Sequence, residues 1–119
     1  MKNIAPNIKR QRLLIEGFYK NIKMDEQKIR EFFIFITGKL NLRAYGEPII
    51  FSPENMGKPD NQGYDAFIPL IDSGISLYVW SESQFISLII YTCKDFSESL
   101  AIDSTIEFFN LVEYTSEAF

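Results

Sequence analysis

The sequence predicts an α+β protein, a two-layer sandwich in which an antiparallel β-sheet carries two helices on one face. The expected elements run in the order strand, helix, several strands, helix, which is not the regular alternation of a parallel sheet. Two segments, 25–40 and 97–111, carry apolar residues at helical spacing. Residues 75–80 (ISLYVW) alternate as the side chains of a half-buried strand do.

The chain is long enough for one domain. Its 119 residues leave room for a single hydrophobic core. We expect residues 1–11, which are mostly polar and include Pro6, to form a flexible N-terminal arm, and residues 12–119 to form the domain. Eleven Phe and six Tyr supply side chains for a core and for a subunit contact. A homodimer is therefore expected if one sheet face stays apolar.

The segment from Asp25 to about Leu40 is the clearest helix. Asp25 can serve as its N-cap, and Glu26 places a negative charge in the first turn. Apolar residues then recur at offsets of 3, 4, 7 and 11, which is one face of a helix. These residues are Ile29, Phe32, Phe33, Ile36 and Leu40. In the second helix, Ile102, Ile106 and Phe109 are expected to face inward.

Five strands are expected, and turn-forming residues separate most of them. The strands are 12–19, 48–52, 64–71, 74–80 and 84–92. The segment 53–63 (PENMGKPDNQG) predicts a loop, and a short turn is expected at Glu82-Ser83. Pro69 places its strand at a sheet edge or a bulge. No element is assigned to the tail 112–119.

The strand 74–80 is expected to present different side chains to the two faces of the sheet. The set expected to face the helices is Ile75, Leu77 and Val79. Ser76, Tyr78 and Trp80 then lie on the opposite face. A face that bears Tyr and Trp is a candidate for a ligand site or a subunit contact, although these side chains would equally suit a core.

The composition excludes several classes of function. A net charge of −4, with one basic cluster at 9–12, argues against nucleic acid. The absence of histidine excludes His/Cys zinc sites and triads that use imidazole. The single cysteine, Cys93, rules out an internal disulfide and fits a reducing compartment. Neither a membrane span of roughly 20 apolar residues nor a signal peptide is expected, so we predict a cytoplasmic protein with no membrane contact.

The segment Asp72-Ser73-Gly74 allows two interpretations. These residues are common in tight turns between strands. A serine in a strained turn can also attack the carbonyl before it, which is the first step in making a pyruvoyl group. Taken alone, the segment is interpreted as a hairpin turn, and Cys93, at the end of a strand, as a half-buried structural thiol.

Two motifs at fixed spacing resemble one family. They are DSGISLYVWSE at 72–82 and TCKD at 92–95. The bacterial and archaeal S-adenosylmethionine decarboxylases have a Glu-Ser-His self-cleavage turn, followed by an alternating strand that ends in Trp or Tyr, Pro, Glu. A Thr-Cys-Gly-Asp signature comes after it. The segment RLLIEGFY at 12–19 also resembles the first strand of that family, and the resemblance covers about residues 12–111.

The resemblance implies roles for particular residues. The Ser73 hydroxyl would attack the Asp72 carbonyl, and elimination and hydrolysis of the ester would leave a pyruvoyl group at position 73. Its ketone would bind the substrate amine and draw electrons as carbon dioxide leaves. Cys93 would be the general acid that returns a proton to the α-carbon. Glu82 would bind the ribose hydroxyls of the substrate, with Trp80 as a further substrate-binding residue.

The chain departs from the family pattern where self-cleavage requires proton transfer. The family histidine that assists processing falls on Tyr78, and a phenol is a poorer base at neutral pH than an imidazole. A second processing residue, normally a serine, falls on Asp65. Gly74 stands where the family has the histidine after the nucleophile, and Asp72 stands where it has glutamate. The Asp65 carboxylate can in principle replace the missing base.

Two functions follow from this comparison of residues. The first is an S-adenosylmethionine decarboxylase-like protein of polyamine biosynthesis that is defective in self-processing, carries no cofactor, and acts as a ligand-binding or regulatory homologue. The alternative is an active pyruvoyl-dependent decarboxylase of S-adenosylmethionine or another amino acid, cleaved between Asp72 and Ser73. In both, the expected ligand is S-adenosylmethionine or a related cationic amine, no metal is expected, and the resemblance suggests a homodimer.

Overall fold

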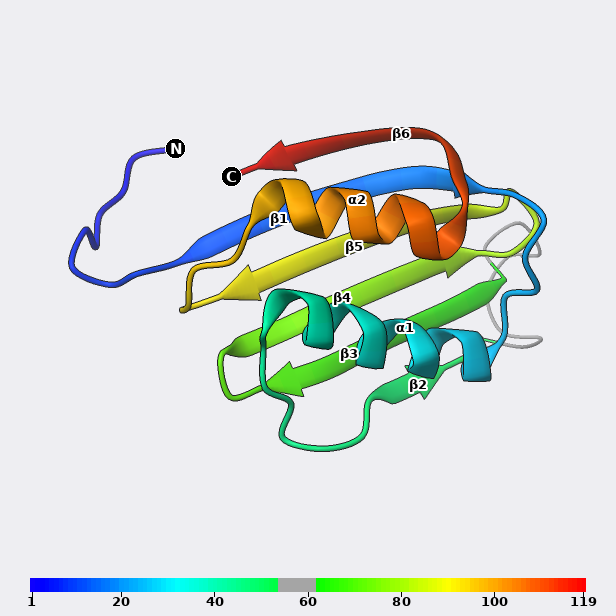
Figure 1. The fold of residues 1–119 in the computed structure, drawn as a ribbon, viewed down its shortest axis with the longest axis horizontal. Coiled ribbons are helices and arrows are strands. Elements are labelled where there is room, and N and C mark those ends of the chain that lie inside the picture. The colour runs from blue at the N-terminus through cyan, green and yellow to red at the C-terminus, as the bar shows by residue number, and fades with distance from the viewer. Residues whose placement is uncertain (54–61) are drawn as a thin grey trace.

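A computed structural model describes residues 1–53 and 62–119. Its elements, drawn in Figure 1, are β1 (Gln11–Tyr19), α1 (Glu26–Leu40), β2 (Ile49–Phe51), β3 (Gly63–Leu70), β4 (Ser73–Trp80), β5 (Phe85–Thr92), α2 (Glu98–Phe109) and β6 (Leu111–Ala118). The five expected strands are all present, with ends shifted by one residue at most. Most of the predicted loop 53–63 lies outside the described residues.

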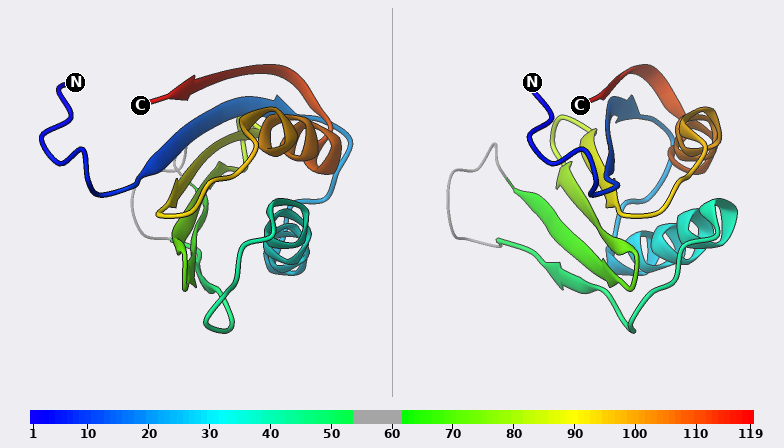
Figure 2. Two further views of the ribbon diagram at one scale, coloured as in Figure 1. Left: turned by 60° about the vertical axis from the view of Figure 1, so that its left-hand side comes forward. Right: turned by 90° about the vertical axis from the view of Figure 1, so that its left-hand side faces the viewer.

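The strands form one sheet in the order β2-β3-β4-β5-β1-β6, and every neighbouring pair is antiparallel. Both helices cover the same face of this sheet, as the side views in Figure 2 show. The opposite face has no helix over it in the part of the chain that the structure describes; we call it the outer face. The predicted α+β two-layer sandwich is therefore confirmed.

The helix termini follow from their capping residues. The Asp25 carboxylate accepts a hydrogen bond from the Lys28 N–H, and the Ser97 side chain accepts one from the Leu100 N–H. All five apolar residues predicted on the first helix face are buried. The prediction for α2 was correct for Phe109, which is buried, but Ile102 and Ile106 are only half-buried. The fully or nearly covered side chains of α2 besides Phe109 are the small ones, Ala101, Ser104 and Thr105.

The sheet separates its two sets of side chains as the alternation predicts. Ile75, Leu77 and Val79 are buried beneath the helices. Tyr78 and Trp80 lie on the outer face, where Tyr78 is exposed and Trp80 is half-buried. The core is therefore the layer between the sheet and the helices.

The tail that received no assignment is an edge strand. β6 pairs with β1 alone, from Leu13↔Ala118 to Tyr19↔Leu111, and of its residues only Leu111 is buried. Gly17 in β1 permits the close approach of β6, because a Cβ at that position would lie 2.8 Å from the Glu113 carbonyl oxygen.

The N-terminal residues 1–10 contain no helix or strand. Lys9 forms an ion pair with Asp95 at 2.7 Å, and the Arg10 guanidinium donates to the carbonyls of Ala5 and Ile8. Among the described residues, no helix is long and apolar enough to cross a membrane.

Candidate active site

The hairpin between β3 and β4 is tighter than the sequence suggested. Leu70 pairs with Ser73, so the loop consists of Ile71 and Asp72 alone. Ser73 and Gly74 already belong to β4, which corrects the interpretation of Asp72-Ser73-Gly74 as the turn itself. Gly74 is needed for packing: a Cβ there would lie 2.6 Å from the Phe67 ring, which rests over this position.

Ser73 has a strained backbone conformation. Its φ is 126°, in a range that favours glycine and that other residues rarely adopt. Such a conformation persists only where surrounding contacts enforce it, and it is concentrated at functional sites. The residue that the resemblance identifies as the nucleophile is thus the strained residue of this hairpin.

The Asp72 carboxylate is buried and is held by Arg43, which follows α1. Asp72 is 4% exposed. Its Oδ2 accepts hydrogen bonds from the Arg43 backbone N–H at 3.0 Å and from Nε at 3.5 Å, while its Oδ1 accepts one from Nη2 at 3.0 Å. The side-chain hydrogen bond from Arg43, and then the one from its backbone, hold the pKa of Asp72 below its ordinary value. Asp72 is therefore ionised and fully engaged at neutral pH.

The segment after Leu42 is tied to the same hairpin through its backbone. The Ile71 N–H donates to the Arg43 carbonyl at 2.8 Å, and the Tyr45 N–H donates to the Pro69 carbonyl at 3.1 Å. Ala44 forms a bridge with Leu70. Arg43 was not predicted from the sequence, because nothing near it indicates a contact with a residue 29 positions further on.

The carbonyl of Asp72 faces the end of β5. Its oxygen accepts a hydrogen bond from the Cys93 N–H at 2.9 Å. Ser73 pairs with Thr92, which is fully buried. The structure therefore brings together Asp72, Ser73 and Cys93, with the Cys93 side chain exposed. An N–H donor on the carbonyl that Ser73 would attack stabilises the negative charge that develops on this oxygen.

Asp65 and Tyr78 form a second group, in the middle of the outer face. They are register partners across β3 and β4. Together with Ile49, Phe51, Ala66, Phe67 and Ser76 they line a depression of about 220 Å³. Tyr78 lies five residues along β4 from Ser73, roughly 17 Å in an extended strand. Within one chain, neither side chain is placed to act on Ser73.

Trp80 and Glu82 lie at the far end of β4. Trp80 is seven residues from Ser73, roughly 23 Å in an extended strand. Its ring is 5.6 Å from that of Phe85, and Phe85 is 5.1 Å from Phe18. Glu82 is exposed in the turn that follows, so the predicted turn at Glu82-Ser83 is confirmed. The predicted site residues thus form three groups within one chain.

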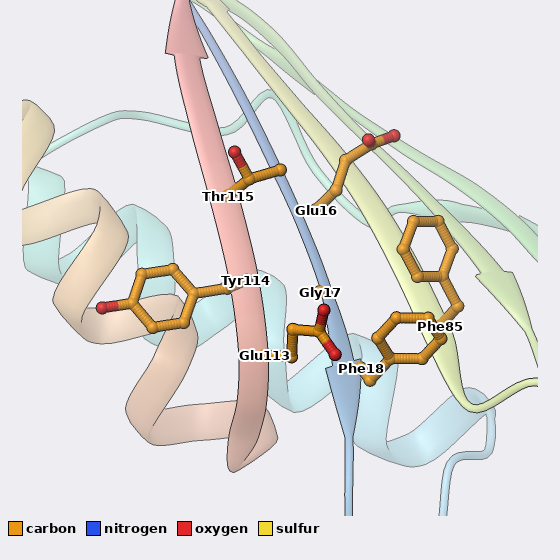
Figure 3. A pocket seen from close by; sticks show the side chains of 7 residues that line it. All are labelled: Glu16, Gly17, Phe18, Phe85, Glu113, Tyr114 and Thr115. Carbon is orange, nitrogen blue, oxygen red and sulfur yellow. The ribbon is translucent and has the colours of Figure 1, made fainter.

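Another hollow, not indicated by the sequence, lies between β5, β1 and β6. It has a volume of about 130 Å³. Figure 3 shows Glu16, Phe18, Phe85 and Glu113 around it, while the Tyr114 side chain points toward the helices. Ser87 donates a hydrogen bond to Glu16 at 2.8 Å. Among residues 1–53 and 62–119, no group of three or more His, Cys, Asp or Glu is placed to hold a metal ion.

By its fold, the protein is a two-layer α+β sandwich, in which Ser73 begins β4 and the Cys93 N–H donates to the carbonyl before it. The chain belongs to the S-adenosylmethionine decarboxylase family, whose model matches residues 13–119. The family uses a pyruvoyl group, binds S-adenosylmethionine and comprises lyases of polyamine biosynthesis.

Among solved structures, the chain is similar to the adenosylmethionine decarboxylase from Aquifex aeolicus VF5. The TM-score is 0.74 and the sequence identity is 22%, over 94% of this chain and 89% of that chain. At this identity the likeness supports the fold. No curated protein matches the chain.

The residues present fit the formation of a pyruvoyl group in part. Ser73 supplies a hydroxyl in a strained hairpin, and the Cys93 N–H polarises the carbonyl that this hydroxyl would attack. The groups that would move protons do not fit equally well. The neighbouring Asp72 carboxylate is occupied by Arg43, and Tyr78 and Asp65 lie elsewhere in the sheet.

Proposed function

We propose that the protein is a ligand-binding or regulatory homologue of S-adenosylmethionine decarboxylase, acting in cytoplasmic polyamine biosynthesis with its Asp72–Ser73 bond intact. The observation that supports this proposal most directly is that Arg43 binds the Asp72 carboxylate. Its carboxylate, the acidic group next to Ser73 in sequence, is bound by the Arg43 guanidinium and backbone. A carboxylate in that state is a poor acceptor for the Ser73 hydroxyl proton.

The positions of Asp65 and Tyr78 support the same conclusion. Self-cleavage moves a proton from the serine hydroxyl to the amide nitrogen that leaves, so a base must reach the hydroxyl. Tyr78 is a phenol, and Asp65 is its register partner in the middle of the sheet. A chain without histidine has no imidazole for this step.

A second candidate, the active pyruvoyl-dependent decarboxylase, is favoured by the backbone at the hairpin. The φ of 126° at Ser73 is strained, and the 2.9 Å hydrogen bond from the Cys93 N–H would stabilise negative charge on the Asp72 carbonyl oxygen. In this candidate, Cys93 is the general acid. The Asp65 carboxylate takes the place of the missing base, and it has to come from a second copy, because within one chain it lies too far along the sheet from Ser73.

Intact-mass spectrometry of the purified protein separates the two candidates. We expect one species with the mass of the full chain, and the same result for Ser73→Ala apart from the substitution. Two fragments, 1–72 and a 73–119 fragment that begins with a pyruvoyl group, would establish the second candidate. In that case Ser73→Ala abolishes the cleavage.

The proposed ligand is S-adenosylmethionine or a related cationic amine, bound on the outer face. The Asp65 carboxylate lies in an otherwise mostly apolar depression and attracts an ammonium group. At the far end, Glu82 and Trp80 offer a carboxylate for hydroxyl groups and an aromatic ring. Trp80 is the single tryptophan, so titration with S-adenosylmethionine should change its fluorescence and raise the melting temperature. A ligand-independent melting temperature contradicts this part of the proposal.

We also propose a homodimer formed through the outer face. Phe18, Phe67, Tyr78 and Tyr91 lie there and are 36–41% exposed. Half-exposed aromatic side chains among polar ones on an uncovered sheet face are common at protein interfaces. A two-fold axis sets the outer face of one copy against the same face of the other, which places residues of the second copy beside the outer-face site residues of the first.

A further inference from the structure

Arg43 contacts the β3–β4 hairpin through both its side chain and its backbone. Its side chain is 63% exposed, yet its guanidinium and its backbone N–H both bind the Asp72 carboxylate. Its carbonyl accepts from the Ile71 N–H at 2.8 Å. Both residues of the two-residue loop are therefore fixed by one residue of the segment that follows α1.

We propose that Arg43 is a positioning residue that holds the Asp72–Ser73 peptide bond in the conformation required for attack by the residue at position 73. The inference deepens the proposed function: the hairpin keeps the geometry for self-cleavage, and what the chain lacks is the proton acceptor.

Three ties determine the conformation of this peptide bond. Arg43 fixes the Asp72 side chain, the Cys93 N–H fixes the Asp72 carbonyl at 2.9 Å, and pairing with Thr92 fixes Ser73. The pairing with Thr92 belongs to the sheet, and the Cys93 hydrogen bond lies just beyond the end of the β4–β5 pairing. Arg43 supplies the tie from outside the sheet. Removing its side chain takes away the Nη2 and Nε hydrogen bonds and leaves the Asp72 carboxylate with the Arg43 backbone N–H alone, which lets the strained φ of Ser73 relax.

The step in question is an isomerisation that requires no other reactant. The oxygen at position 73 forms a bond to the Asp72 carbonyl carbon, and the bond from that carbon to the nitrogen of residue 73 breaks. The proton lost by the hydroxyl ends on the released amine, and the amide becomes an ester. Hydroxylamine then attacks the ester carbonyl, giving residues 1–72 as a hydroxamate and residues 73–119 with a free amino group.

The test uses Ser73→Cys, because a thiol ionises near neutral pH far more readily than a hydroxyl and depends less on a protein base. We expect this variant, incubated with hydroxylamine, to give the two fragments by intact mass. Adding Arg43→Ala should slow the cleavage roughly tenfold or more, since small misplacements of reacting groups carry costs of this size. Arg43→Lys in the same Ser73→Cys chain keeps the charge and should slow the cleavage less.

The matched control is Arg30→Ala in the Ser73→Cys chain. Arg30 forms an ion pair with Glu47 at 3.4 Å on the surface, away from the hairpin, and its removal should leave the rate unchanged. All rates are compared at a temperature where circular dichroism shows each variant folded. If Arg43→Ala does not fold, Arg43→Lys carries the comparison.

The outcomes separate this inference from the proposed function. Ser73→Cys that resists hydroxylamine, or that is cleaved as fast or faster without the Arg43 side chain, overturns the role of Arg43. Faster cleavage would show that Arg43 acts by withholding the Asp72 carboxylate as a proton acceptor. An unsubstituted chain that is already cleaved overturns the intact homologue instead, and the Arg43 variants then test the same role on the natural reaction.

Discussion

The two ends of β4 differ in how firmly their functional residues are held. At the start, Asp72 is buried and hydrogen-bonded, and the strained Ser73 is locked into pairing with β5. At the other end, Glu82 is exposed, and among the described residues its side chain has no hydrogen-bond or ion-pair partner. At the first end, contacts within one chain hold both residues in place. The second end is the one where we propose that a ligand binds.

The same contrast holds between the two faces of β4. The inner face is finished by the helices, whereas the outer face presents half-exposed aromatic rings. Mutations of inner-face residues should therefore lower the free energy of unfolding. Residues of the outer face should respond in assays of association or binding.

The largest effect on the free energy of unfolding is expected when two neighbouring residues on opposite faces of β4 are compared. Leu77→Ala removes a fully buried side chain and should lower the free energy of unfolding by about 2–5 kcal/mol. Tyr78→Ala, one residue further on, should lower it by less than about 1 kcal/mol in the dissociated chain. Urea unfolding at low protein concentration measures both. Equal losses would mean that the outer face is also packed within one chain.

A charge on the outer face should dissociate the proposed dimer. Tyr78→Asp buries an unpaired carboxylate in the interface and should weaken association by about a hundredfold or more. Ile34→Asp is the control, because Ile34 is 74% exposed on α1, away from the outer face. Sedimentation velocity over a range of concentrations distinguishes them. A protein that sediments as a monomer before any substitution contradicts the dimer.

An acid-dependent effect should appear at the Ser73 end. The pKa of Asp72 is lowered in the folded state, chiefly by the hydrogen bond from the Arg43 side chain. The unfolded chain therefore binds more protons between the folded-state pKa and the ordinary aspartate value of about 3.9. The stabilisation is fully present above that value and is lost as the pH falls through the folded-state pKa.

Asp72→Asn should remove this part of the acid dependence, while Asp65→Asn should keep it. The measurement is the urea midpoint between about pH 6 and pH 2.5. Identical pH profiles for the parent and Asp72→Asn would show that the ion pair with Arg43 does not form in solution.

Patterns local in sequence were sufficient for most of the fold. Alternation assigned the faces of β4, and an N-cap with helical spacing placed α1. β6 was not predicted because its alternation is weak: Ser116 and Ala118 follow Val112 and Tyr114 in the set that should be apolar. It is also an edge strand that buries little. Its position depends on pairing with β1, far away in the chain.

The candidate site residues stay predictions from the motifs, and their geometry could not be predicted from the sequence. Motif spacing identified Ser73 and Cys93, and the structure places their backbones on either side of the Asp72 carbonyl. The position of the strain was not predictable. Glycine is the residue expected to adopt an unusual φ, which indicates Gly74, but the unusual φ is at Ser73. Arg43 was missed because its contact with Asp72 joins two loops that only the tertiary fold brings together.

The smallest effect on stability is expected at the N-terminal arm, which lies at neither end of β4. Lys9 and Asp95 form an ion pair at 2.7 Å, but their side chains are 60% and 76% exposed. Solvent screens a pair of this kind, so Lys9→Ala should change the free energy of unfolding by less than about 1 kcal/mol. The difference should shrink further in high salt. A larger loss, independent of salt, would show that the arm packs on the domain through contacts other than this ion pair, and that it contributes to the structure around β5.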